Sequence, residues 1–125
     1  MKLSFLSDPE RAQRPWRLVF VAGLCATLVL ALVPSVPEAL STGWDKSNHV
    51  LAFFVLTVLG CLAFPRHRSV PLALLVLFGV AIEVLQALTP TRQSDWHDVV
   101  ADVIGIVLAL LVMPLILRLV PAARR

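Results

Sequence analysis

Side chains that could move a proton or hold a ligand fall on three stretches of this sequence. Within each stretch they stand three or four residues apart, so on a helix they would share one face. Carboxylates beside an imidazole or an amide can act in acid–base chemistry or as ligand donors. The three sets are Asp45 with His49, Glu83 with Gln86, and Asp95 with Asp98 and Asp102.

The chain around these sets is far more apolar than a soluble domain. Of its 125 residues, 58% are hydrophobic and 15% are charged, whereas a soluble domain carries about 25% charged residues. Four continuous apolar stretches approach the ~20 residues that cross a bilayer as a helix. The sequence therefore predicts an all-α integral membrane protein, a single domain over 1–125 that forms a four-helix transmembrane bundle, with helices at about 17–36, 46–64, 70–89 and 98–120.

The first apolar stretch resembles a secretory signal sequence. It is longer than the usual apolar core of about 7–15 residues, and no clear small-residue cleavage site follows, so we interpret it as a membrane helix. Pro90 is expected to end the third helix, and Pro114 could kink the fourth. Cys25 and Cys61 lie in apolar stretches and are expected to be small buried residues without a disulfide.

The distribution of lysine and arginine predicts the orientation of the bundle. Nine of these side chains lie in the segment up to Arg17, in the 65–69 turn and from Arg118 onward. Only Lys46 and Arg92 lie in the other two loops. Because cytoplasmic segments are enriched in lysine and arginine, we expect both termini in the cytoplasm and these two loops outside.

Most acidic residues are expected near the outer ends of the helices. A charged carboxylate at the centre of a bilayer costs about 2.5–3.5 kcal/mol on insertion scales, so these groups should face one another. They outnumber the nearby cations Lys46 and Arg92, even with a charge on His49. Protonation, a bound cation or a cationic part of a ligand would relieve the excess. The set is Asp45, Glu83, Asp95, Asp98 and Asp102.

Some of these residues have a simpler structural interpretation. Helix capping or interfacial anchoring would account equally well for Asp95, Asp98 and Lys46. The deeper residues are the stronger functional candidates, namely Glu83, Asp102 and His49. His49 and the carboxylates could supply metal ligands, but no compact motif such as H-E-x-x-H is present, so we expect no metal and no cofactor.

Small and aromatic residues have structural roles in this interpretation. Ala101, Gly105 and Ala109 recur every four residues, which predicts a ridge for close helix packing. Tryptophan side chains are typical of the membrane–water interface, and they lie near the predicted helix boundaries at Trp16, Trp44 and Trp96.

Taken together, the polar motifs resemble those of the VanZ-like family. Over 45–105 they read Asp45-Lys46-x-x-His49, Ile82-Glu83-x-x-Gln86, Arg92-x-x-Asp95-x-x-Asp98 and Ala101-Asp102-x-x-Gly105. The resemblance implies a small multi-helix protein of the bacterial envelope, in a family named for a member linked to teicoplanin resistance. The positions that correspond to family motifs are Asp45, Lys46, His49, Glu83, Gln86, Arg92, Asp98 and Gly105.

The leading hypothesis is a non-enzymatic accessory or binding protein of the bacterial inner membrane. Its outward-facing polar pocket would take a lipid, a cell-wall precursor or a glycopeptide-like ligand. The ligand-binding or functional residues would be Asp45, Lys46, His49, Glu83, Gln86, Arg92, Asp95, Asp98 and Asp102.

Two other functions remain open from the sequence. An intramembrane enzyme could modify a lipid-linked substrate with His49 as acid or base, although no catalytic residue can be assigned. An ion pathway is disfavoured because the inner halves of the helices carry few polar residues. We expect membrane lipids as partners and no nucleic acid, because the basic residues flank the membrane; the oligomeric state is left open.

Overall fold

The computed structural model describes residues 9–120 of the protein. It contains four long helices, α1 (Pro9–Leu32), α2 (Asp45–Ala63), α3 (Ser69–Ala87) and α4 (Trp96–Leu119), and a short 3-10 helix, η2 (Glu38–Leu40). No strand occurs in this part of the chain. All four α-helices are long and apolar enough to cross a membrane, which indicates a multi-pass membrane protein. The predicted all-α, four-helix fold is confirmed.

Helix α1 differs most from its predicted bounds of 17–36. It begins at Pro9, because the polar segment before the apolar stretch also favours helix. There the Arg17 guanidinium donates to Glu10 at 2.9 Å and to Gln13 at 3.2 Å, on the preceding turns. The helix ends at Leu32 because Pro34 disfavours a helical conformation for the residue before it.

The other helices begin and end within two residues of the prediction. Helix α4 begins at Trp96 because the Asp95 carboxylate caps it, accepting the His97 backbone N–H at 3.0 Å. It continues as a helix through Pro114. The connection from α1 to α2 contains η2.

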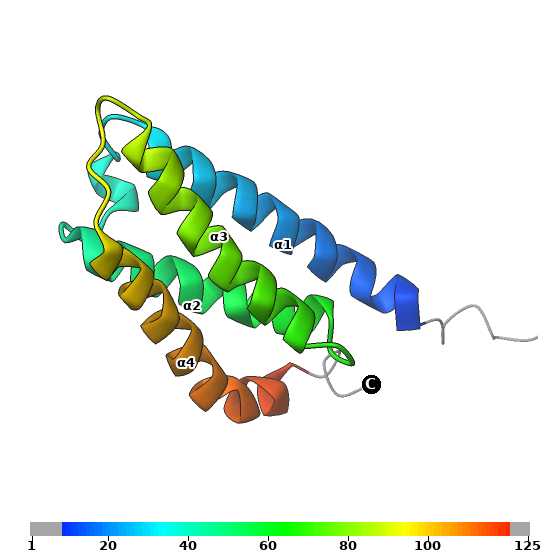
Figure 1. Cartoon of the computed structure of the whole chain (residues 1–125). Coiled ribbons are helices and arrows are strands. Elements are labelled where there is room, and N and C mark those ends of the chain that lie inside the picture. Colours follow the sequence, from blue (N-terminus) through cyan, green and yellow to red (C-terminus); the bar gives the residue numbers. More distant parts are fainter. Residues whose placement is uncertain (1–8, 121–125) are drawn as a thin grey trace, which may run out of the picture.

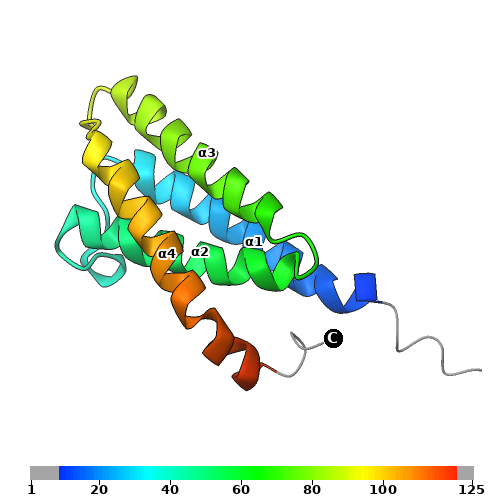
Figure 2. The same cartoon turned by 60° about the horizontal axis from the view of Figure 1, so that its bottom comes forward.

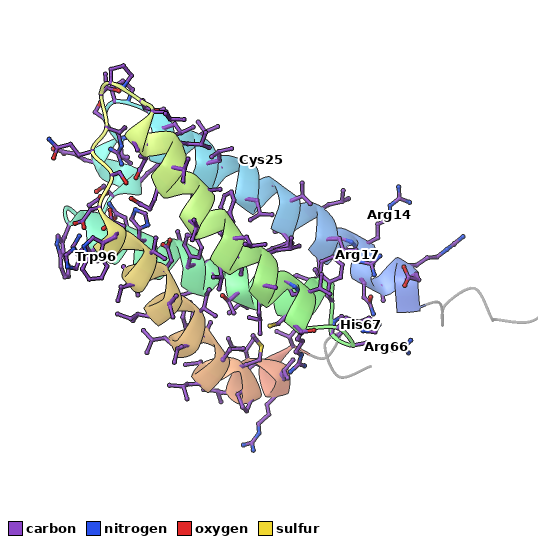
Figure 3. All side chains as sticks on the ribbon, in the orientation of Figure 1. Arg14, Arg17, Cys25, Arg66, His67 and Trp96 are labelled. Atoms are coloured by element: carbon purple, nitrogen blue, oxygen red, sulfur yellow. The ribbon has the colours of Figure 1, made fainter. Side chains whose placement is uncertain are left out.

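The two ends of the bundle contain different segments of the chain, as Figure 1 shows. We call the end with the connections 33–44 and 88–95 the loop end. The opposite end holds the 64–68 turn, the start of α1 and the end of α4, and we call it the basic end. Arg14, Arg17, Arg66 and His67 lie there, whereas Trp96 lies at the loop end (Figure 3). Four charged residues that bear on the predicted orientation lie outside the described residues: Lys2, Asp8, Arg124 and Arg125.

Helix α2 is the central element of the bundle. It packs against each of the other three helices, most extensively against α4, while α1 packs against α2 and α3 (Figures 1 and 2). The buried core is built mainly from Phe20, Phe53, Leu56, Leu75 and Ile82. Many other apolar side chains point outward, as expected for helices whose solvent is lipid.

The two cysteines lie in different environments. Cys61 is buried, as expected, but the prediction for Cys25 is wrong, because that residue is exposed. Helix α1 contacts the bundle through one side only, which leaves its other face open to lipid.

Gly105 allows the backbones of α2 and α4 to approach closely. A methyl group at this position would collide with the Val50 carbonyl oxygen and would lie 3.0 Å from the Phe54 backbone nitrogen. Ala101 and Ala109, one turn to either side, are also buried. A ridge of small residues on α4 therefore faces α2, and it sets the separation of the two helices that carry most of the polar residues.

We predict that Gly105→Ala lowers the free energy of unfolding in detergent by about 1–3 kcal/mol, because backbone atoms of α2 must move to admit the methyl group. Denaturant titration of the purified protein measures this change. Val103→Ala, at an exposed position on the same helix, is the control and should change stability much less. Equal stability of Gly105→Ala and the wild type would contradict the close approach.

Candidate functional site

Helices α2 and α4 meet at the loop end and bring five ionisable side chains into one group. We call this group the polar cluster. The Lys46 ammonium donates to Asp95 at 2.7 Å and to Asp98 at 2.9 Å, and thus bridges α2 to the start of α4. One turn deeper, His49 meets Asp102. The polar cluster is Lys46, His49, Asp95, Asp98 and Asp102.

The deepest contact in the cluster joins His49 to Asp102. The His49 Nδ1 atom lies 2.8 Å from Asp102 Oδ1, and both residues are buried. With Asp102 ionised and His49 neutral, Nδ1 donates its proton to the carboxylate, because an ionised carboxylate can only accept a hydrogen bond, and Nε2 keeps its lone pair. That second nitrogen lies 3.8 Å from Asp98 Oδ2, beyond hydrogen-bond distance. His49 therefore presents a fixed face with an available acceptor atom.

A glycine on α3 makes room for the Asp102 carboxylate. A methyl group at Gly79 would lie 2.5 Å from Asp102 Oδ2. This oxygen is buried and has no hydrogen-bond partner among the residues that the structure describes. Asp102 is thus held between His49 and α3 with one oxygen unsatisfied.

Asp95 stands at the outer edge of the cluster, before the first residue of α4. The Lys46 ammonium lowers the pKa of the Asp95 carboxyl below its usual range, and the backbone and side chain of His97 lower it further. Because the pKa of Asp95 is lower in the folded protein than in the unfolded chain, ionised Asp95 stabilises the fold. This stabilisation is fully present at pH values above the ordinary pKa of an aspartate. This contribution is lost as the pH falls toward the folded-state value.

Glu83 of α3 connects the cluster to the loop before α4. Its Oε2 atom accepts from the Ser94 hydroxyl at 3.1 Å and from the Asp95 backbone N–H at 2.9 Å. The other oxygen, Oε1, is buried and has no hydrogen-bond partner within residues 9–120. The role of Ser94 is visible only in the folded protein, where the loop before α4 lies against α3.

Gln86 is not part of the polar cluster. Its amide donates to the Ala31 carbonyl oxygen at 2.9 Å and so satisfies a backbone group in the last turn of α1. Glu83 and Gln86 were predicted to share one face of a helix, and they contact different elements. Gln86 connects α3 to α1, whereas Glu83 connects α3 to α4.

Arg92 and Asp45 form a loose pair at the loop end. Their nearest charged atoms are 3.8 Å apart, and the Arg92 side chain is 17% exposed while that of Asp45 is 56% exposed. Among the contacts of residues 9–120, no hydrogen bond of the Arg92 guanidinium is found, although it carries five N–H donors. Most of this cation is thus removed from solvent without a strong protein partner.

A pocket of about 500 Å³ runs between α1 and α2 and reaches these charged residues. Its walls are mostly apolar, and polar groups line it at the loop end, where Asp45, Asn48, His49 and Arg92 contribute. Such a combination of apolar walls and a few convergent polar groups is typical of ligand sites.

The sequence analysis missed the contribution of α1 to this pocket. Small residues line it from α1, three of them four residues apart (Gly23, Thr27 and Ala31), and they leave space instead of filling it. They are Gly23, Ala26, Thr27 and Ala31. This spacing is a signal that the sequence carried. Asn48 was also missed as a pocket residue.

Three donor groups lie close enough together to be considered as metal ligands. Asp45, His49 and Asp98 each place one ligand atom within 4.8 Å of the others. Both carboxylates already face a cation of the protein, since Lys46 contacts Asp98 and Arg92 contacts Asp45. Any cation bound between them would therefore share these carboxylates with two positive side chains.

Comparison with known proteins gives one family. The family model described as VanZ/LLP1 matches residues 3–118 of the chain. An uncharacterised protein of Schizosaccharomyces pombe is 32% identical over 98 residues, which cover 74% of this chain and 59% of the yeast protein. The chain thus spans less than two thirds of that relative. No solved structure matches.

We predict that burial makes the His49–Asp102 contact far more important for stability than the similar His97–Asp95 contact. His49→Ala leaves a buried carboxylate unpaired and should cost about 3–5 kcal/mol of unfolding free energy. His97→Ala breaks a contact of 2.7 Å between exposed side chains and should cost about 0–1 kcal/mol.

Denaturant unfolding of both variants and of His49→Ala combined with Asp102→Asn measures these costs. The second substitution removes the unpaired charge and should recover much of the lost stability. Equal losses for the two histidine variants would contradict this assignment.

Proposed function

We propose, since this chain belongs to the VanZ/LLP1 family, that it is a non-enzymatic membrane protein that binds an amphiphilic ligand. The apolar part of the ligand would lie in the pocket between α1 and α2, and its polar part at the loop end. Candidate ligands are an envelope lipid, a cell-wall precursor and a glycopeptide-like molecule. A role in the cell envelope, including any link to teicoplanin resistance, is part of this proposal.

The proposal rests on the change in polarity along the length of the pocket. Apolar side chains such as Leu51 and Leu59 line most of it, and charged groups occur only toward the loop end. An amphiphile has the same division, because a tail needs apolar surroundings and a headgroup needs hydrogen-bond partners. The exposed residue Ala26 also lines the pocket, so a lipid could enter it from the bilayer.

The proposed orientation places the basic end in the cytoplasm and the loop end outside, in the inner membrane of a bacterium. Arg14, Arg17, Arg66 and Arg68 all belong to the basic end, and cytoplasmic flanks are enriched in such residues. The ligand would then be taken from the outer leaflet, because that is where the polar groups of the pocket would lie.

A second candidate function is supported by the His49–Asp102 contact. A histidine fixed by a carboxylate, with its other nitrogen available beside a pocket, has the arrangement of a general base. The nearby hydroxyl groups have other partners, since Ser94 donates to Glu83 and Ser47 donates to the Trp44 carbonyl. We therefore favour binding. A product released from a lipid-linked substrate by the wild type, but not by His49→Gln, would favour the enzyme.

We predict that Ala26→Trp weakens lipid retention by at least about tenfold, because the indole would occupy the pocket. Native mass spectrometry of the protein purified in mild detergent measures retained lipid. Cys25→Trp is the matched control, since Cys25 is the adjacent residue and is also exposed but does not line the pocket. Equal retention by the two variants would contradict the proposed location of the ligand.

A further inference from the structure

We propose that the headgroup bound at the loop end is that of an aminophospholipid, phosphatidylethanolamine, with its ammonium between Asp45, His49 and Asp98 and its phosphate on Arg92. This inference rests on the proposed function, because it names the lipid that the pocket would hold. We infer the ammonium from the three acceptor groups and the phosphate from the arginine.

The acceptor groups have the chemistry that an ammonium requires. Asp98 uses one oxygen for Lys46, and its other oxygen faces His49. His49 donates through Nδ1 to Asp102, so Nε2 of a neutral ring is an acceptor. Asp45, more than half exposed, supplies the third group. A primary ammonium carries three N–H donors, one for each of these acceptors.

The separation of the acceptors leaves room for an ammonium. Acceptors at ~2.8 Å from a tetrahedral nitrogen are ~4.6 Å apart, whereas ligands of tetrahedral zinc, at ~2.0–2.1 Å, are ~3.4 Å apart. In the protein, His49 Nε2 and Asp98 Oδ2 are 3.8 Å apart, between these two values, and the ligand atoms of all three residues lie within 4.8 Å of one another. The limit of 4.8 Å includes the spacing that an ammonium requires.

Arg92 supplies the complementary charge for the phosphate. Its guanidinium lines the pocket, is largely buried and contacts Asp45 only at 3.8 Å. A planar guanidinium can donate two parallel hydrogen bonds to a phosphate, which are stronger than those between neutral groups. Because the two subsites adjoin through the Asp45–Arg92 pair, the amine and phosphate must be joined by a short linker, as in ethanolamine.

The charges of the site also favour this headgroup over the headgroups of other lipids. An anionic headgroup without an amine would bind Arg92 through its phosphate but would bring no cationic donor to Asp45, His49 and Asp98. A choline headgroup carries a positive charge but no N–H donor for the three acceptors. We therefore expect phosphatidylethanolamine to bind more tightly than phosphatidylglycerol or phosphatidylcholine with the same acyl chains.

The test is native mass spectrometry of the full chain with equimolar amounts of these three lipids. The other two headgroups lack the charge-assisted hydrogen bonds of the ammonium, so the wild type should retain phosphatidylethanolamine at least about tenfold over them. Asp45→Asn should remove most of the protein's preference for phosphatidylethanolamine over phosphatidylglycerol. Arg92→Gln should weaken retention of phosphatidylethanolamine by about tenfold, and Arg66→Gln, at the basic end, should leave it unchanged.

The outcomes separate this inference from the proposed function. Equal retention of all three lipids by the wild type, lost in Ala26→Trp, would overturn the headgroup assignment and leave the lipid pocket in place. Failure to retain any lipid would overturn the pocket as well. Binding of Zn²⁺ that requires Asp45 and His49 and excludes phosphatidylethanolamine would identify the three acceptors as a metal site and overturn the inference.

Discussion

Buried charged groups at the loop end of the bundle require hydrogen-bond partners, and this requirement determines how the helices pack. Asp98 and Asp102 are buried on α4, and a carboxylate in such surroundings is costly unless a donor or cation reaches it. Lys46 and His49 reach them from α2. The two helices can meet closely because Gly105 presents no side chain to the backbone of α2. The most extensive helix contact in the fold is therefore also the one that neutralises the polar cluster.

The remaining helices extend this arrangement into a pocket. Glu83 connects α3 to the start of α4, and Gln86 connects α3 to the end of α1. Small residues on α1 then leave a cavity between α1 and α2 that ends at His49 and Arg92. The loose pair of Arg92 with Asp45, and the free nitrogen of His49, are polar groups that the fold positions without satisfying. A ligand with both charges would complete their hydrogen bonds.

Most of the fold could be predicted from the sequence, because length and apolar composition determine which segments can cross a bilayer. Helical spacing also placed His49, Asp98 and Asp102 on the sides of α2 and α4 that face each other. What it could not predict depends on tertiary packing. The spacing of Glu83 and Gln86 gave no indication that they contact different helices. Likewise, α1 forms a wall of the pocket because its small residues leave space, and this space exists only once the helices pack.

The central claim is that a lipid occupies the pocket between α1 and α2 with its headgroup at the loop end. Cross-linking of the reconstituted protein with a lipid that carries a photoreactive group in its acyl chain tests this most directly. Our account predicts that mass spectrometry finds the cross-links concentrated on pocket residues such as Thr27, Leu51 and Leu59. Cross-links spread evenly over the exposed apolar faces of α3 and α4 would contradict it.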